Sequence, residues 1–352
     1  MGDKIFHALI RPAGPDGFDL DEAAMVEWLT SSGLDHRLPL RATRIGLGQS
    51  NLIFEITDAD DRRWILRRPP LGRLLSSAHD VVREARILTA LAGTDVPVPR
   101  IVDLATDDGV PVVLMEHVAG LVIDRPVIAA ALSPQHRRAV GIALPRTLAR
   151  IHAVNLDDTG LADLASHKPY AERQLKRWTA QWERTKTRDV PRVDRLAERL
   201  RAAIPPQREL GLVHGDFHIR NVITDPVGGD ITAVLDWELC TLGDPLADLG
   251  SLLAYWPQPG ERETDSFAMC ALPGFPSRAE LVTEYVAATA RDVAALGFWH
   301  ALGLWKIAVI REGVLRRTRD DPRNQAIGAV PTIAQIDAVI DAADAAATHA
   351  GL

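Results

Sequence analysis

The pattern of the chain changes from strand-like to helical about one third of the way along its 352 residues. Strand-like stretches separated by turns occupy residues 45–56, 63–67, 97–103 and 110–117. Residues 77–91 instead place Val81 and Ala85 on one face, which predicts a helix. We therefore expect a small antiparallel sheet with one main helix over residues 40–117.

The rest of the chain is predicted to be mostly helical. A helix opens at Ser133 and Pro134, because serine is a good N-cap and proline suits the first turn. Further helices are expected at residues 168–188, 278–296, 298–319 and 332–348, with two short strands between residues 211 and 237. This α+β order, a small β-rich lobe followed by a larger helical lobe, is typical of a bilobal protein-kinase-like fold. The expected regions are a helical N-terminal extension (1–39), a nucleotide-binding lobe (40–117) and a catalytic and acceptor-binding lobe (118–352).

Composition limits the kinds of partner. Hydrophobic residues make up 47% and charged residues 25% of the chain, an ordinary globular mixture. The formal net charge of −7 gives no support to a nucleic-acid partner. The two cysteines, Cys240 and Cys270, are too few for a disulfide framework. With no apolar run near the roughly 18 residues of a membrane span and no signal peptide, we expect a cytoplasmic protein without a membrane partner.

The strongest signal is the block from His214 to Asn221. A His-x-Asp tripeptide followed by Asn five positions after the Asp is a kinase signature, and Asp216 and Asn221 have that spacing. Phosphoryl transfer needs a carboxylate that accepts the proton of the attacking hydroxyl, which suits Asp216. It also needs oxygen ligands for Mg²⁺, which suits Asn221.

A second oxygen ligand follows in the next strand. Gly228 and Gly229 suit the turn of a hairpin, and a turn centred on them places Asn221 opposite Asp236. A different loop would shift this register. The simplest alternative is a polar hairpin in which the Asp and His residues only serve the turn, but the whole constellation favours the kinase interpretation.

The first lobe offers weaker nucleotide-binding signals. Gly46 and Gly48 lie between two strands, where backbone N–H groups can approach phosphates, and Ser50 and Asn51 could add polar contacts. A Gly-x-Gly turn alone more often marks a plain hairpin. After the last strand, the backbone from Glu116 to Val118 stands where a hinge would hydrogen-bond an adenine edge.

An arginine stands where a kinase has its phosphate-binding lysine. Arg67 lies on the strand at 63–67, and its guanidinium could clamp phosphate oxygens. Glu84 lies near the apolar face of the following helix, and an inward carboxylate needs a cationic partner. We therefore predict an Arg67–Glu84 ion pair; the alternative is a set of solvated surface charges.

The chain resembles the aminoglycoside phosphotransferase family over about residues 20–345, and within it the kinase domains fused to acyl-CoA dehydrogenases and their stand-alone bacterial relatives. The residues that carry the likeness are 48–51, 66–70, 74–79, 83–84, 214–216, 235–238 and 242–249. The resemblance implies that Asp216 is the catalytic base, that Asn221 and Asp236 bind Mg²⁺, and that Arg67 with Glu84 orients the phosphates of ATP, or of GTP, in the cleft between the lobes. It also implies a small-molecule acceptor, and a separate acyl-CoA dehydrogenase is a possible partner.

The acceptor is less constrained. Residues 168–188 carry seven basic and two acidic residues, a net charge of 7 − 2 = +5, which suits an anionic hydroxylated acid or acyl-CoA. Lys176, Arg177 and Arg184 are the predicted acceptor contacts, with Glu238 as a further candidate. A solvated helix face explains the same charges. An antibiotic kinase for aminoglycosides or macrolides and a non-catalytic nucleotide-binding pseudokinase stay open as alternatives.

Overall fold

The computed structural model describes residues 4–7, 9–12, 18–45, 51–69, 81–261, 267–320 and 330–352. The chain forms two compact units. Unit 1 contains Met1–Gly93 and Val98–Ala119, and unit 2 contains Thr94–Pro97 and Gly120–Leu352.

Unit 1 is built on a six-stranded sheet. In spatial order its strands are β1 (Ile5–Phe6), β7 (Ile101–Asp107), β8 (Val110–Glu116), β6 (Arg63–Arg68), β5 (Leu52–Thr57) and β4 (Arg41–Ile45). All neighbours are antiparallel except β1 and β7, which are parallel. A separate hairpin joins β2 (Ile10–Pro12) to β3 (Phe18–Leu20), and the unit's helices are α1 (Glu22–Ser31) and α2 (Val81–Leu91).

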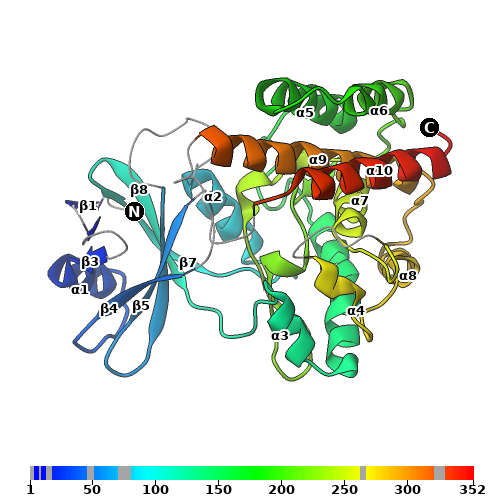
Figure 1. Cartoon of the computed structure of the whole chain (residues 1–352). Coiled ribbons are helices and arrows are strands. Elements are labelled where there is room, and N and C mark those ends of the chain that lie inside the picture. Colours follow the sequence, from blue (N-terminus) through cyan, green and yellow to red (C-terminus); the bar gives the residue numbers. More distant parts are fainter. Residues whose placement is uncertain are drawn as a thin grey trace. The chain divides into compact units, whose positions relative to one another are not determined.

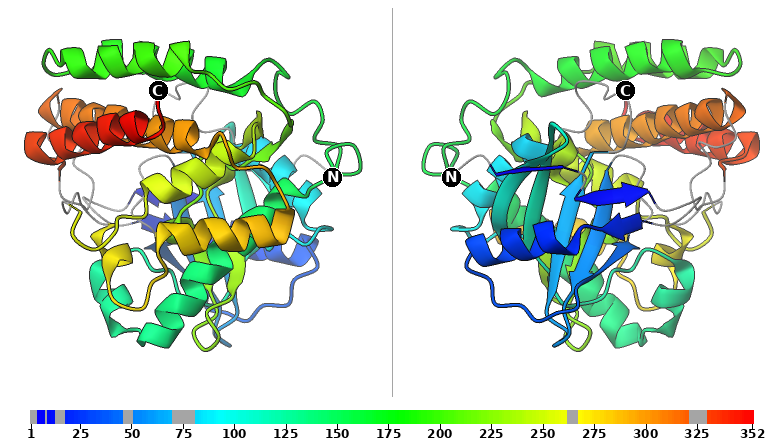
Figure 2. Two further views of the ribbon diagram at one scale, coloured as in Figure 1. Left: turned by 90° about the vertical axis from the view of Figure 1, so that its right-hand side faces the viewer. Right: turned by 90° about the vertical axis from the view of Figure 1, so that its left-hand side faces the viewer.

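The two-residue period of the strands sorts the core of unit 1 onto two faces. On one face, Trp28 of α1 belongs to a buried cluster with Leu66 of β6 and Leu114 of β8. On the other, Val81 of α2 packs with Val113, the neighbour of Leu114. The right-hand view of Figure 2 shows α1, in dark blue, lying across the strands. Strands β6, β7 and β8 thus contribute residues to both the α1 side and the α2 side.

The strand expected at residues 97–103 is displaced. It begins at Ile101 and runs to Asp107. Pro97 and Pro99 have no backbone N–H to donate to a ladder, so pairing starts only beyond them. The parallel pairing of β1 with β7 was not expected either, because two residues carry no strand pattern that can be detected.

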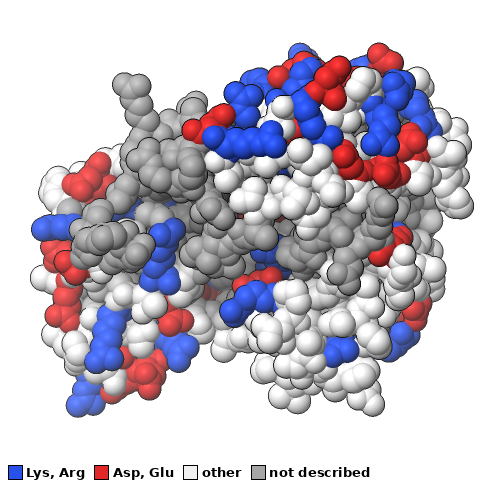
Figure 3. Space-filling model, in the orientation of Figure 1, with Lys and Arg blue, Asp and Glu red and all other residues white. Residues whose placement is uncertain are grey.

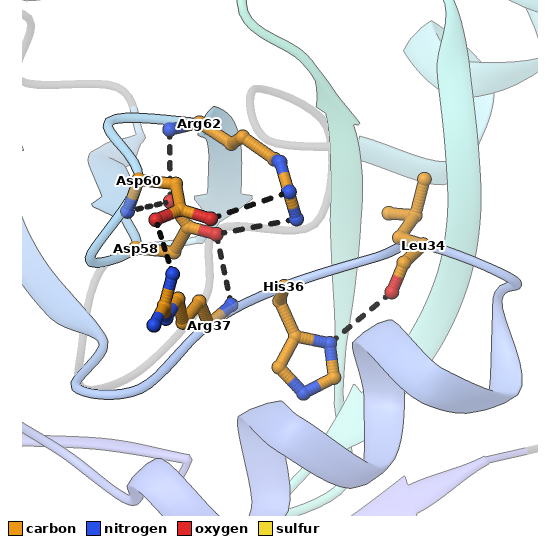
Figure 4. Close-up of polar contacts among 6 residues, drawn as sticks. All are labelled: Leu34, His36, Arg37, Asp58, Asp60 and Arg62. Carbon is orange, nitrogen blue, oxygen red and sulfur yellow. Dashed lines mark hydrogen bonds and ion pairs between the residues drawn. The ribbon is translucent and has the colours of Figure 1, made fainter.

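A buried carboxylate closes the turn between β5 and β6 (Figure 4). The Asp58 side chain is fully buried and accepts hydrogen bonds from the backbone N–H groups of Arg37, Asp60 and Arg62, each at 2.9 Å. Burial opposes its ionisation, but these three donors outweigh it and hold the pKa of Asp58 below its ordinary value. The turn expected between the strand-like stretches at 45–56 and 63–67 is therefore confirmed at residues 58–62.

We expect Asp58→Ala to lower the free energy of unfolding by about 1–3 kcal/mol, because three backbone donors lose their acceptor. Asp60→Ala is the matched control in the same turn, since the Asp60 side chain is exposed and makes only long ion pairs. Urea denaturation of both variants measures the difference. Equal losses in the two would show that the buried acceptor is not what stabilises the turn.

Unit 2 is mostly helical. Its longer elements are α3 (Pro126–Ala131), α4 (Pro134–His152), α5 (Tyr170–Thr185), α6 (Pro191–Ala202), α7 (Leu246–Ala254), α8 (Arg278–Thr289), α9 (Leu296–Asp320) and α10 (Ile333–His349). Its four short strands are β9 (Gly211–Val213), β10 (Val222–Thr224), β11 (Ile231–Val234) and β12 (Thr241–Gly243). Strand β9 pairs with β12 and β10 pairs with β11, both antiparallel.

Helix α9 is the centre around which unit 2 is packed. It contacts α7, α10 and α5, and α10 lies alongside it in Figure 1. The approach of α7 is very close, because a Cβ added to Gly250 would lie 2.5 Å from the backbone carbon of Trp299. This contact fixes the first turn of α7, which carries Asp248.

The helices expected in unit 2 are found, with shifted ends. Ser133 caps α4 by accepting the N–H of His136 at 3.1 Å, as predicted. The helix expected at 278–296 ends at Thr289, because Ala290 is left-handed with φ 54° and terminates it. Among the helices that the structure describes, none combines the length and apolarity needed to cross a membrane.

Candidate active site

The three residues of unit 2 that are predicted to carry the chemistry lie in the turns and loops next to its short strands. Asp216 follows β9, Asn221 ends the 3₁₀ turn Ile219–Asn221 before β10, and Asp236 follows β11. Asn221 and Asp236 therefore stand at the same end of the β10–β11 hairpin.

The register of this hairpin differs from the predicted one by one residue. Val222 pairs with Val234, and the Asn221 carbonyl accepts the N–H of Leu235 at 2.8 Å. Asn221 is thus opposite Leu235 and not Asp236. The turn is not centred on the two glycines: Asp225 N–H donates to the Asp230 carbonyl, and a register shift follows Ile223.

A glycine is required at the second position of the His-Gly-Asp sequence. Gly215 has φ +84°, and a Cβ there would lie 2.7 Å from the carbonyl oxygen of Leu239. Any side chain would therefore push residues 214–221, the candidate catalytic loop, away from the segment that follows Asp236.

A buried carboxylate on α7 holds the catalytic loop. Asp248 accepts the backbone N–H groups of His214 at 2.6 Å and Gly215 at 2.8 Å, and its side chain is only 1% exposed. Burial raises the pKa of Asp248, but the hydrogen bonds and the charge of His152 outweigh this and hold it below its ordinary value. Asp248 therefore acts as a permanent acceptor for two consecutive loop amides.

His214 is a neutral imidazole with a defined tautomer. It is fully buried, and burial lowers its pKa. Nε2 lies 3.0 Å from the carbonyl of Leu235, so Nε2 carries the proton. Nδ1 is then the acceptor, and it faces the N–H of Asp216 at 3.3 Å.

The Asp216 carboxylate is held on several sides. The Asn221 amide donates to the Asp216 carbonyl at 3.0 Å, and its nitrogen lies 3.4 Å from Oδ2. His218 Nε2 also lies 3.4 Å from Oδ2, and the Tyr255 hydroxyl lies 3.4 Å from Oδ1. Burial raises the pKa of Asp216, but His218 and Lys306 outweigh it, so the pKa is well below its ordinary value. The side chain is 23% exposed, so an acceptor can reach an ionised carboxylate.

Sequence reasoning missed His218 and Tyr255. Their rings pack edge to face with centroids 4.7 Å apart, and Phe267 lies 5.0 Å from His218. His218 lies inside the signature, but its spacing to Asp216 gives no sign of contact. Tyr255 directly follows α7, 39 residues after Asp216, and no local pattern connects them.

Asp236 adopts a conformation that few residues other than glycine accept. Its φ and ψ are 65° and 61°, in the left-handed region, which aspartate tolerates better than most side chains. The following Trp237 is fully buried and donates from its indole N–H to the Val234 carbonyl at 3.0 Å. A strained backbone conformation of this kind persists only where the surrounding structure holds it in place, and such residues are often found at functional sites.

Asn221 and Asp236 fit a divalent metal that is shared with phosphates. The Asn221 amide nitrogen points to Asp216, which leaves its side-chain oxygen as the candidate metal ligand. Over the described ranges no group of three His, Cys, Asp or Glu side chains could form a metal cage. Mg²⁺ usually binds one or two protein oxygens together with substrate phosphates, and this donor set suits that mode.

In unit 1, the predicted ion pair between Arg67 and Glu84 is confirmed. Arg67 Nη2 lies 2.8 Å from Glu84 Oε2, and the side chains are 10% and 4% exposed. Alternation explains the pair. Residues 66 and 68 of β6 face the α1 side, so Arg67 faces α2, where Glu84 is buried.

The other predicted nucleotide contacts have different outcomes. Gly48 and Ser50 lie outside the described residues, and Asn51 is buried just before β5. Glu116 ends β8, and its N–H donates to the Arg100 carbonyl at 2.9 Å. Val118 is half-buried in the stretch after β8. The structure leaves the nucleotide-binding role of these residues a prediction.

Three of the predicted acceptor residues lie on α5, and the fourth, Glu238, lies in the turn after Asp236. Lys176 lines a surface groove with Arg201 of α6, Arg177 lies over the Trp178 ring at 5.2 Å, and exposed Arg184 donates to Gln181. Glu238 is half-buried in the turn after Asp236. Their role in acceptor binding also remains a prediction.

The positive charge of residues 168–188 is partly compensated. Lys186 pairs with Glu183 at 2.7 Å, and Arg188 pairs with Asp337 of α10 at 2.7 Å. In Figure 3, basic and acidic side chains mix at the top, over α5 and α6. The surface over α5 and α6 therefore carries charges of both signs.

The family follows from a comparison with known proteins. The model of the family described as "Phosphotransferase enzyme family", abbreviated APH, matches residues 41–296, well over half of the chain. The chain belongs to this family. Phosphotransferases of this family act on small molecules, and their protein-kinase-like fold is the fold of this chain.

Proteins similar to this phosphotransferase include members of the acyl-CoA dehydrogenase family and phosphotransferases of known structure. Acyl-CoA dehydrogenase family member 10 from Mus musculus is 37% identical over 80% of this chain, but the match spans only 27% of that protein. A candidate aminoglycoside phosphotransferase from Ralstonia eutropha JMP134 has a solved structure that is 29% identical, with TM-score 0.75 and coverage of 94% of this chain and 98% of that one. Amicoumacin kinase, solved with AMP-PNP and Ca²⁺, shares the fold at 16% identity, with TM-score 0.58 and 94% coverage of each chain.

We expect the Arg67–Glu84 pair of the phosphotransferase to behave as one energetic unit. Arg67→Met or Glu84→Gln alone should lower the free energy of unfolding by about 3–5 kcal/mol, because each leaves a buried charge without this partner. The double variant should lose less than the sum of the two. Denaturation of all four proteins in a double-mutant cycle gives the coupling, and additive losses would contradict it.

Proposed function

We propose that this enzyme transfers the γ-phosphoryl group of ATP, with Mg²⁺, to a hydroxyl of a small-molecule acceptor. The observation that carries the proposal is the Asp216 carboxylate, which is ionised, partly exposed and held beside Asn221. A carboxylate of this kind can orient an acceptor hydroxyl and take its proton as the oxygen attacks.

The metal would be held by the Asn221 side-chain oxygen and the Asp236 carboxylate. When bound, Mg²⁺ neutralises charge on the β- and γ-phosphate oxygens. The nucleotide and Ca²⁺ in the amicoumacin kinase structure support a nucleotide and a divalent metal for this fold. ATP is proposed as the donor, with GTP as an alternative.

Unit 1 is proposed as the nucleotide-binding part and unit 2 as the catalytic and acceptor-binding part. The Arg67–Glu84 pair would present a guanidinium of fixed orientation to phosphate oxygens. The remaining proposed nucleotide contacts are Gly48, Ser50, Asn51, Glu116 and Val118. Unit 1 takes in the extension predicted at residues 1–39 together with most of the lobe predicted at 40–117, and unit 2 corresponds to most of the lobe predicted at 118–352.

For the acceptor we propose a hydroxylated acid or hydroxyacyl-CoA. The name of the mouse relative supports this, because acyl-CoA dehydrogenases act on acyl thioesters. Phosphorylation turns a hydroxyl into a good leaving group, which prepares an acyl chain for elimination. Lys176, Arg177 and Arg184 have no acidic partner among the described residues and are the proposed anion contacts, with Glu238 close to Asp236 in sequence.

An antibiotic acceptor is the second candidate. The description of the Ralstonia structure as a candidate aminoglycoside phosphotransferase favours it. A non-catalytic role is disfavoured, because Asp216, Asn221 and Asp236 are all present. A separate acyl-CoA dehydrogenase as partner remains a prediction.

We expect Asp236→Ala to abolish Mg²⁺-dependent nucleotide binding, because it removes one of the two proposed metal ligands. Asp230→Ala, on the exposed turn of the same β10–β11 hairpin, is the control and should bind normally. Titration of ATP with and without Mg²⁺ by calorimetry measures both variants. Unchanged metal dependence in Asp236→Ala would remove Asp236 from the site.

The function itself is tested by screening acceptors. Purified protein with Mg²⁺-ATP is offered hydroxy acids, hydroxyacyl-CoAs, aminoglycosides and macrolides, and phosphorylated products are detected by mass spectrometry. We expect products from the hydroxyacyl class, and Asp216→Asn should reduce their rate by about 10²- to 10⁴-fold while ATP still binds. Efficient phosphorylation of antibiotics alone would establish the second candidate.

A further inference from the structure

A lysine of α9 contacts the backbone of the catalytic loop. The Lys306 ammonium donates to the carbonyl oxygen of Gly215 at 2.7 Å. The same ammonium lies 5.3 Å from the ring centroid of Trp178 on α5, within cation–π range. Lys306 therefore connects α9, α5 and the loop that carries Asp216.

This contact restrains the peptide group that joins Gly215 to Asp216. Its carbonyl oxygen belongs to Gly215 and accepts from Lys306, and its N–H belongs to Asp216 and faces His214 Nδ1. A peptide group is planar, so partners on both sides fix its rotation. The rotation of this plane sets the direction in which the Asp216 side chain leaves the backbone.

The loop needs such support because packing around it is incomplete on this side. A cavity of about 30 Å³ is lined by Gly215, Trp178, Asp248, Trp299 and Lys306, among others. A side chain on Gly215 could not fill this space, because its Cβ would collide with Leu239, which does not line the cavity. A directional hydrogen bond from Lys306 supplies the restraint that side-chain packing does not.

The charge of Lys306 also suits this place. Burial holds the pKa of the Lys306 ammonium below its ordinary value, although the carboxylates of Asp216 and Asp248 oppose this shift. The cation in turn favours the ionised form of Asp216. A neutral donor could hold the carbonyl, but it would not add this attraction.

We propose that Lys306 is a positioning residue for phosphoryl transfer, which fixes the Gly215–Asp216 peptide and so aims the Asp216 carboxylate at the acceptor hydroxyl. The inference rests on the proposed role of Asp216 as the base. Lys306 acts through the loop, and Trp178 keeps its ammonium in place.

Lys306→Met tests the proposal, because methionine keeps the unbranched length and removes the donor and the charge. We expect kcat for ADP formation from Mg²⁺-ATP, with the acceptor found in the screen or with water, to fall about 10- to 100-fold. The KM for ATP should stay within about twofold, because the nucleotide does not depend on this peptide. Lys306→Arg should recover part of kcat. Arg316→Met, an exposed arginine on the same helix, is the matched control.

Two controls distinguish a positioning role of Lys306 from a merely structural one: a correction for the folded fraction and a double variant with Asp216→Asn. Rates are corrected for the ATP-binding fraction of each preparation, and kcat of Lys306→Met within about twofold of wild type would overturn the proposal. In an Asp216→Asn background, Lys306→Met should have little further effect, since its target is already gone. An undiminished loss there would also overturn it.

The same set of variants distinguishes this inference from the proposed function. Activity lost in Asp216→Asn but kept in Lys306→Met would overturn the role of Lys306 and leave the function standing. Activity kept in Asp216→Asn would overturn the role of Asp216, and the Lys306 inference with it.

Discussion

The conformation of the catalytic loop depends on the hydrogen bonds that the loop donates to the Asp248 carboxylate. It lies in the first turn of α7 and accepts two consecutive backbone amides, those of His214 and Gly215. A carboxylate that accepts two such donors while buried cannot be replaced by an amide without turning one acceptor into a donor. Its own position depends on the close contact of α7 with α9 at Gly250, so the geometry of a catalytic loop is set by helix packing.

Much of the fold was predictable because its signals are local. The β-rich beginning, the helical remainder and the cap at Ser133 follow from periodicity and capping, which depend on neighbouring residues. The displaced start of β7 was also readable in principle, since Pro97 and Pro99 stand in the sequence. The parallel β1 was not readable, because a two-residue strand is defined only by its distant partner.

For the site, one predicted contact was confirmed and one predicted register was wrong. The Arg67–Glu84 pair was predictable because strand alternation and helix periodicity each orient one partner. The hairpin register was predicted one residue off, because a longer turn with an Asp225–Asp230 closure replaced the expected glycine turn. Tyr255 and Lys306 contact the loop of Asp216 from helices far along the chain, and only tertiary packing brings them there.

The pairing of β1 with β7 has a consequence for the order in which unit 1 is assembled during synthesis. The Leu9 N–H donates to the Asp107 carboxylate, 98 residues later, and Ile5 pairs with Thr106 in the same region. Strand β1 must therefore wait until β7 has been synthesised before it gains this partner. Closing so long a loop costs entropy that only a formed sheet can offset, so β1 is expected to dock last in unit 1. A nascent chain that stops short of β7 thus carries residues 5–6 without their strand partner.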